Sequence, residues 1–212
     1  MTTDWVQWHA DYDDPGSSLT RRLVVVQRFL RDALAEVPAD RPIRLLSLCA
    51  GDGRDVLPVL AEQPHRVRAL LVELDARLAG AARVTADRLG LAGVEVRAAD
   101  AGTTGSYGDH LPVRVLLACG VFGNIAPEST RRTIAALPAW LEDDGVVIWT
   151  RGRGDAGFDA GAQVRQWFVE EGFAELGYVA PDDARFRVGM SRRRAIPPVE
   201  VPPATRMFEF AR

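Results

Sequence analysis

The sequence predicts an α/β domain built on a doubly wound, mostly parallel, seven-stranded sheet. From residue 43 onward, short apolar runs alternate with longer segments of helical periodicity, a pattern typical of parallel strands joined by right-handed helical crossovers. The runs are apolar throughout, as expected for strands that helices cover on both faces. With 212 residues, 47% of them hydrophobic, the chain is long enough for a single domain with a large core.

The first 42 residues precede the first predicted sheet strand and are expected to form an N-terminal helical cap or lid. The composition of residues 11–18 favours a turn, and residues 19–35 carry apolar side chains at helical spacing. Pro38 and Pro42 then interrupt the chain. Residues 43–150 are expected to form the central core, and residues 151–212 to complete the sheet.

Within the core the two element types alternate regularly. Strands are expected at residues 43–49, 67–73, 94–98, 113–118 and 146–150, and helices at 54–62, 76–89, 128–141 and 162–171. A strand over 173–179 follows. Residues 186–191 and 206–210 both have the pattern of extended chain, and since no helix precedes them, a strand formed there should be antiparallel. The residues alone do not decide which of the two segments enters the sheet.

The composition excludes several classes of function. The formal net charge is −3, so a large nucleic-acid footprint is not expected. The chain has no lysine, which excludes a lysine Schiff base. Its two cysteines, Cys49 and Cys119, lack metal-ligand spacing, and no metal is expected. No secretory signal opens the sequence and no apolar run nears the ~18 residues that span a membrane, so we expect a cytoplasmic protein without membrane contact.

A glycine turn follows the first buried strand, and an acid ends the second. Gly51, Asp52 and Gly53 form the turn, and Glu73 comes twenty residues after Gly53. This pairing is how an α/β sheet holds an adenosine-bearing cofactor. A dinucleotide fingerprint would place a third small residue where Val56 stands, and the Asp52 carboxylate would repel a pyrophosphate. The turn also lacks the lysine of a phosphate-binding loop.

Residues 43–150 resemble the class I S-adenosylmethionine-dependent methyltransferases. The family's first motif is an acid-x-G-x-G-x-G turn, and Gly51 and Gly53 match its last two glycines, whereas Ser47 and Cys49 replace its acid and its first glycine. Asp52 is the nearest substitute for the missing acid, which would face the amino group of the cofactor. The resemblance implies that the cofactor lies over a turn made of Cys49, Ala50, Gly51, Asp52 and Gly53.

Three later motifs resemble the family at successive strand ends. Glu73 matches the acid that binds both ribose hydroxyls, and Leu74 would pack on the adenine. Asp100, followed by Ala101, matches the acid near the adenine amino group. In the family, the fourth strand ends in small residues under the cofactor, and Cys119 and Gly120 take this place here. We expect both cysteines to act as small apolar residues on the pocket floor.

The resemblance implies methyl transfer to a small molecule, with an anionic acceptor as one possibility. Arg151 and Arg153 follow the fifth strand and could clamp an anion, although they could equally be two surface charges. The family's nucleobase and amide methylators carry a (D/N/S)-P-P-(Y/F) signature that is absent here. Candidate acceptor contacts are Trp8, Tyr12, Phe122, Asn124, Arg151 and Arg153, and candidate catalytic residues, should a general base be needed, are His9, Tyr12, Asp13 and Asn124.

Three alternatives stay open. The chain could use S-adenosylmethionine for another reaction, or bind it without turnover. A nicotinamide-dependent oxidoreductase is the third, and Asp52 and Val56 weigh against it. The oligomeric state does not follow from the sequence.

Overall fold

The fold was analysed in a computed structural model. It describes residues 14, 16–154, 159–194, 200 and 204–210. None of the helices in these ranges is long and apolar enough to cross a membrane.

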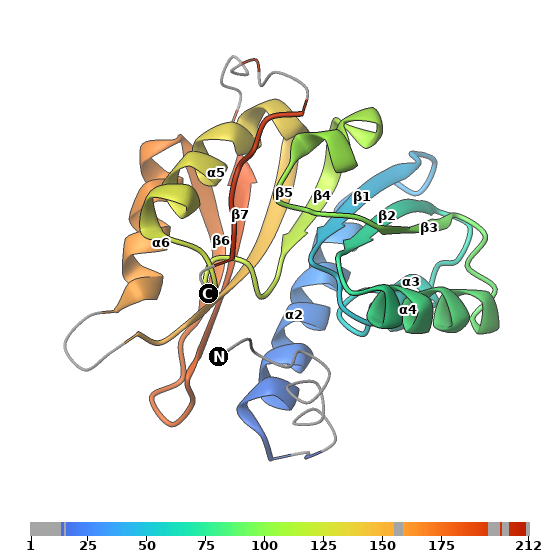
Figure 1. Ribbon diagram of the computed structural model, residues 1–212, viewed down its shortest axis with the longest axis horizontal. Coiled ribbons are helices and arrows are strands. Elements are labelled where there is room, and N and C mark those ends of the chain that lie inside the picture. Colours follow the sequence, from blue (N-terminus) through green and yellow to red (C-terminus); the bar gives the residue numbers. More distant parts are fainter. Residues whose placement is uncertain (1–13, 15, 155–158, 195–199, 201–203, 211–212) are drawn as a thin grey trace.

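Seven strands form one sheet in the order β3-β2-β1-β4-β5-β7-β6 (Figure 1). Strand β7 pairs antiparallel with both β5 and β6, and the other neighbouring strands pair in parallel. The order reverses between β1 and β4, and such a switch point is where open α/β sheets bind ligands. The strands are β1 (Ile43–Leu48), β2 (Val67–Glu73), β3 (Val94–Ala98), β4 (Val113–Ala118), β5 (Leu141–Gly152), β6 (Phe173–Val179) and β7 (Phe186–Arg193).

Helices cover both faces of the sheet. One face packs against α2 (Ser18–Ala35), α3 (Leu57–Leu60) and α4 (Ala76–Arg88). The other packs against α5 (Pro127–Trp140) and α6 (Ala160–Glu170). Adjacent residues of a strand serve opposite faces: Leu45 belongs to the first core and Leu46 to the second, and neither is exposed. This two-sided burial explains why the strands read as continuous apolar runs.

Side chains cap the N-termini of three helices. Ser17 accepts a hydrogen bond from the Thr20 N–H at the start of α2, and Asp75 and Asp159 cap α4 and α6 in the same way. The helix expected over residues 54–62 is much shorter, because the chain is still turning at Gly53, whose φ is +79°, and α3 begins only at Leu57. A helix of one turn offers little dipole to a phosphate, which further weakens the dinucleotide alternative.

The structure decides which C-terminal segment enters the sheet. Residues 186–193 form β7, the expected antiparallel strand, whereas residues 204–210 stay outside the sheet. They make two isolated bridges, Thr103 to Arg206 and Ile125 to Phe210. We call residues 204–210 the C-terminal segment. It crosses the loops that follow β3 and β4, and Figure 1 shows it running over the middle of the sheet.

Candidate active site

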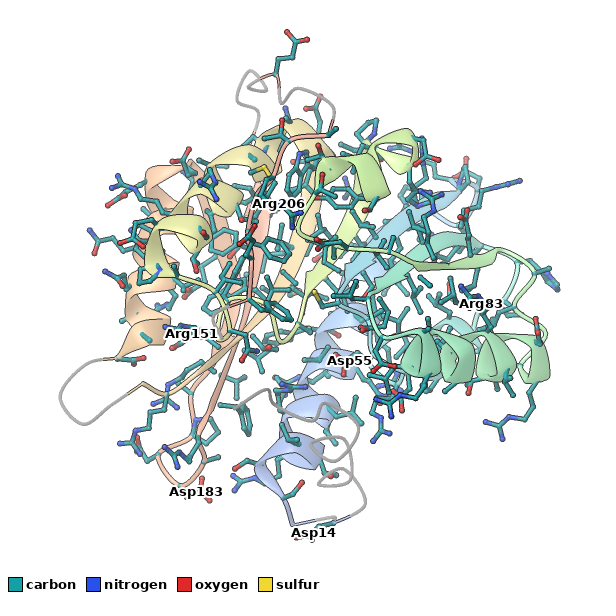
Figure 2. The ribbon with its side chains drawn as sticks, in the orientation of Figure 1. Asp14, Asp55, Arg83, Arg151, Asp183 and Arg206 are labelled. Carbon is teal, nitrogen blue, oxygen red and sulfur yellow. The ribbon has the colours of Figure 1, made fainter. Side chains whose placement is uncertain are left out.

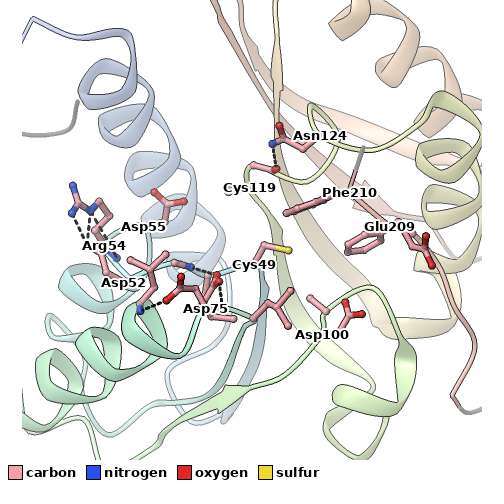
Figure 3. A pocket seen from close by; sticks show the side chains of 18 of the residues that line it. Cys49, Asp52, Arg54, Asp55, Asp75, Asp100, Cys119, Asn124, Glu209 and Phe210 are labelled. Atoms are coloured by element: carbon pink, nitrogen blue, oxygen red, sulfur yellow. Dashed lines mark hydrogen bonds and ion pairs between the residues drawn. The ribbon is translucent and has the colours of Figure 1, made fainter. Parts of the chain in front are cut away.

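A cavity of about 390 Å³ opens at the carboxyl ends of β1, β2 and β4 (Figure 3). Its walls come from the loops after these strands and after β3, from α2 and from the C-terminal segment. Six acidic side chains and three arginines line it, so the wall carries an excess of negative charge. The charged lining residues are Asp52, Asp55, Glu73, Asp75, Asp100 and Glu209, with Arg22, Arg54 and Arg206.

The turn after β1 uses left-handed backbone conformations at three positions. Cys49 has φ of 53°, Gly51 of 58° and Gly53 of 79°. Glycine adopts this conformation freely, whereas a side chain there costs roughly 1–2 kcal/mol. Cys49 stands where the related family has its first glycine and takes the conformation that a glycine would favour. The backbone path of the turn is therefore kept although the residue differs.

Glu73 is fixed between two backbone donors at the end of β2. The Gly51 N–H donates to its Oε2 at 2.8 Å, and the Asp75 N–H donates to its Oε1 at 2.8 Å. The side chain is buried, with the residue 9% exposed, yet it lines the cavity. Because each carboxylate oxygen has a second lone pair, Glu73 can still accept two hydrogen bonds from a ligand with vicinal hydroxyls.

The two aspartates that follow the turn have different surroundings. Asp52 forms a multiple ion pair with Arg54, with Nε at 2.9 Å from both carboxylate oxygens. Asp55 faces the buried Arg22 of α2 and lies beside Cys119, with Asp52 and Arg54 also in range. Its Oδ1 is buried without a hydrogen-bond partner within the described ranges. Burial raises the pKa of Asp55 above its usual value, and the charge of Arg22 partly opposes this rise.

Asp100 ties the loop after β3 to the C-terminal segment. Its Oδ1 accepts from the Gly102 N–H at 2.7 Å, and its Oδ2 accepts from Arg206 at 2.5 Å. The Gly102 carbonyl accepts from the Met207 N–H at 2.7 Å. This contact places Phe208 and Phe210 on the cavity wall, with their rings stacked 6.1 Å apart.

Both cysteines lie on the cavity wall as free thiols. Burial is the main cause that raises the pKa of each, and the charge of Glu73 adds to it at Cys49 and that of Asp55 at Cys119. Protonated thiols are poor nucleophiles. Their place on the wall agrees with the expectation that both are small apolar residues of the pocket floor, which stays a prediction. Within the described ranges, no group of three or more His, Cys, Asp or Glu side chains could hold a metal ion.

Of the expected acceptor contacts Asn124 and Phe122, only Asn124 lines the cavity. Asn124 lines the cavity and donates from Nδ2 to the Gly120 carbonyl at 2.6 Å. Phe122 does not reach the cavity: it is 0% exposed and packs against Trp149 and Phe168 in the core. Its expected role as an acceptor contact conflicts with this burial, because the ring packs against aromatic side chains of β5 and α6.

Arg151 and Arg153 do not form a paired clamp. Arg153 is exposed and donates to the Asp182 carbonyl at 3.0 Å, in the turn between β6 and β7. Arg151 is half-buried at the end of β5, its guanidinium beside Gly123 (Figure 2). Burial lowers the pKa of Arg151, and the described part of the chain supplies no anion to it. Arg151 lies within β5, whereas Arg153 lies beyond its end, so strand geometry does not bring the two side chains to one face.

Most of the expected cofactor residues meet at the cavity. Gly53 alone is set back from it: a Cβ there would lie 2.6 Å from Leu57, so the glycine serves the packing of the turn. Trp8, His9, Tyr12 and Asp13 lie outside the described residues. The expected residues on the wall are Cys49, Ala50, Gly51, Asp52, Glu73, Leu74, Asp100, Ala101, Cys119, Gly120 and Asn124.

Sequence reasoning missed several parts of the wall, including Arg54, Asp75 and Leu78. Arg22 and Asp55 were not expected there, although Asp55 is only two residues beyond the glycine turn. The C-terminal segment was also missed, and its one signal is the group of large apolar residues Met207, Phe208 and Phe210 after a proline-rich stretch.

No protein-family model and no curated protein matches the sequence. Solved structures do match. The magnesium protoporphyrin IX methyltransferase of Synechocystis PCC 6803, with bound S-adenosylhomocysteine, aligns with a TM-score of 0.67 and 14% identity over 91% of this chain and 94% of that one. The 1,6-didemethyltoxoflavin-N1-methyltransferase of Burkholderia thailandensis, with S-adenosylhomocysteine bound, has a TM-score of 0.65 and 18% identity over 89% and 86%.

The chain has the class I methyltransferase fold. The strand order, the antiparallel β7 and the alignment over nearly the full length of two such enzymes agree on this. An RNA methyltransferase of Salinibacter ruber has the same fold, with a TM-score of 0.51 and 21% identity over 84% of this chain and 95% of that one. The fold by itself therefore does not support the expected exclusion of nucleic-acid substrates.

Proposed function

We propose that the cavity binds S-adenosylmethionine and that the protein transfers its methyl group to a small-molecule acceptor. The observation that carries this proposal is Glu73. Two backbone N–H groups fix its carboxylate at the end of β2 and leave acceptor capacity facing the cavity. A ribose offers two vicinal hydroxyls to such a carboxylate, and charge-assisted hydrogen bonds are the stronger kind. Three proteins of the same fold hold S-adenosylhomocysteine.

The cavity wall fits the adenine part of the cofactor on one side of Glu73 and the sulfonium part on the other. Leu74 is 69% exposed and offers an apolar surface to an adenine, with Ala101 nearby on the wall. Beyond the ribose, the cysteines and Gly120 make a floor of small residues. The excess of acidic side chains favours a ligand with a cationic sulfonium and disfavours the anionic pyrophosphate of a dinucleotide.

The protein's contribution to the chemistry is alignment and exclusion of water. S-adenosylmethionine supplies an already activated methyl group. The apolar wall made by Cys119, Phe208 and Phe210 excludes water beside it, and the turn closed by the Asn124 amide holds the end of β4 in place. Holding two reactants in line can account for several kcal/mol of a displacement barrier. An acceptor whose nucleophilic atom carries no proton needs no general base.

Arg151 supports an anionic acceptor. A half-buried guanidinium without an anion in the described ranges is an unfavourable arrangement, and a carboxylate or phosphate of the acceptor would relieve it. Arg151 lies at the carboxyl end of β5, beside the loop after β4 that carries Asn124. Arg151 does not line the cavity itself, so we propose that the acceptor extends from the end of β4 toward this side chain. We assign the anion contact to Arg151 alone.

Calorimetric titration tests the cofactor assignment. The protein should bind S-adenosylhomocysteine and not NAD, and Glu73→Ala should weaken that binding by about 30-fold or more, since hydrogen bonds to a charged group contribute about 1.5–3 kcal/mol each. Glu128→Ala, an exposed acid at the start of α5, is the matched control and should leave affinity unchanged. Binding of NAD in place of S-adenosylhomocysteine, or full affinity in Glu73→Ala, would overturn the assignment. Transfer of labelled methyl to a panel of acidic small molecules then tests turnover.

A further inference from the structure

The end of the cavity beside α2 contains a carboxylate, Asp55, with one unpaired oxygen, although its side chain also has a hydrogen bond with Cys119 and lies in the field of Arg22. Asp55 lines the cavity, and its Oδ1 is buried without a hydrogen-bond partner in the described part of the chain. A buried carboxylate oxygen without a donor is costly, because it has lost water and gained nothing in return. Because the residue lines the cavity, a ligand bound there is the natural source of the missing donor.

The other acids on the wall are already engaged. Asp52 pairs with Arg54, Asp100 pairs with Arg206, and Glu73 accepts two backbone N–H groups. Asp75 caps α4 and pairs with Arg77, and Glu209 is largely exposed and lies 3.8 Å from Arg206. Asp55 is therefore the acid best placed to receive a cation from the cavity.

A buried arginine accompanies Asp55. Arg22 of α2 is 7% exposed and lines the same end of the cavity. Figure 3 shows Asp55 and Asp100 on opposite sides of Cys49, so this end lies away from the expected adenine site. A carboxylate and a guanidinium side by side present the two charges that an α-amino acid group needs, since its ammonium seeks an acceptor and its carboxylate seeks a two-pronged donor.

We propose that Asp55 receives the ammonium group, and Arg22 the carboxylate, of the amino-acid part of S-adenosylmethionine. This inference rests on the proposed cofactor. It replaces the expectation that Asp52 takes over from the missing acid of the first motif. Asp52 is tied to Arg54, and Ser47 is 2% exposed within β1 and carries no charge.

Two ligands that differ only in the amino-acid group can measure how much that group contributes to binding. S-adenosylhomocysteine carries the amino-acid group, whereas 5′-methylthioadenosine has the same adenosine thioether without it. Asp55→Asn keeps the shape of the side chain and removes its charge. Calorimetry should show that Asp55→Asn weakens S-adenosylhomocysteine binding by about 10- to 100-fold, the range for a charged hydrogen bond. Its affinity for methylthioadenosine should stay within about twofold, which also shows that the cavity remains folded.

Further variants sharpen the test. Arg22→Gln should show the same selectivity as Asp55→Asn, and Glu73→Ala should weaken both ligands alike. Glu128→Gln, at an exposed acid away from the cavity, should leave both affinities unchanged, whereas Asp52→Asn tests the competing assignment. Loss of S-adenosylhomocysteine affinity in Asp52→Asn with none in Asp55→Asn would overturn the proposal, as would equal losses for both ligands in Asp55→Asn. If the unaltered protein binds neither ligand, the proposed cofactor itself is wrong.

Discussion

Gly102 determines whether the C-terminal segment can lie against the cavity, and Gly102→Ala tests this. A Cβ at this position would lie 2.3 Å from the Phe208 carbonyl oxygen and 2.9 Å from the Asp100 carboxylate. The first neighbour is backbone, so the segment would have to retreat by roughly 1 Å to reach ordinary contact. That movement breaks or weakens two hydrogen bonds to the Gly102 carbonyl, from Met207 at 2.7 Å and Phe208 at 3.3 Å.

The expected loss follows from these contacts. Each hydrogen bond contributes about 0.5–1.5 kcal/mol net, so Gly102→Ala should lower the free energy of unfolding by about 1–3 kcal/mol. If the segment detaches, Met207 and Phe208, now 2% and 3% exposed, lose their burial, and the loss grows by a further ~1.5–3 kcal/mol for each. Both a shift of the segment and its detachment move Phe208 and Phe210 away from their places on the cavity wall. We therefore expect S-adenosylhomocysteine affinity to fall about tenfold.

Urea denaturation and calorimetric titration measure the two effects on the same samples. Gly105→Ala is the matched control, because it lies in the same loop, a Cβ there meets Ala204 only at 3.5 Å, and both stability and affinity should be preserved. Gly102→Ala with unchanged stability and affinity would refute the idea that the close approach holds the segment in place.

Two further predictions concern charged groups at the cavity. Arg151→Ala should raise the KM for an anionic acceptor by about tenfold or more while Arg153→Ala leaves it unchanged, and equal effects in the two variants would contradict a single-arginine site. Burial raises the pKa of Asp55, with Arg22 and Cys119 among its charged or titratable neighbours, and an ammonium partner lowers it again. Calorimetry should therefore show S-adenosylhomocysteine affinity falling as the pH drops through that raised pKa. Parallel pH profiles for S-adenosylhomocysteine and methylthioadenosine would count against the assignment.

The sheet could be predicted because its signal is local. Strands β1, β2 and β4 are mostly apolar runs that end at a polar residue or a turn, and two-sided burial produces this pattern directly. The edge strand β3 instead alternates apolar and charged residues and is only partly buried. The limits of β5 were harder to predict. Its first residues pair with Val113, and its last pair with β7, contacts that periodicity does not reveal. The choice between the two C-terminal segments had the same difficulty, since both have the alternation of a strand.

Only the part of the cavity wall that lies at fixed positions relative to strand ends could be predicted from the sequence. Glu73 and the turn glycines have fixed positions relative to strand ends, so a motif can find them. The environment of Asp55 depends on Arg22, which a helix more than thirty residues earlier brings to it. The ion pair between Asp100 and Arg206 joins residues more than a hundred positions apart. Phe122 was misplaced for a related reason, because its ring is buried by Trp149 and Phe168, which lie far from it in the sequence.

The position of the C-terminal segment links ligand binding to local opening of the chain. Arg206, Phe208 and Phe210 line the cavity but lie outside the sheet, so the segment can separate from the cavity without loss of any strand pairing. Ligand binding stabilises only the state that binds it, by an amount set by its concentration relative to Kd. A bound cofactor should therefore hold the C-terminal segment in place and slow hydrogen exchange at the Met207 and Phe208 amides.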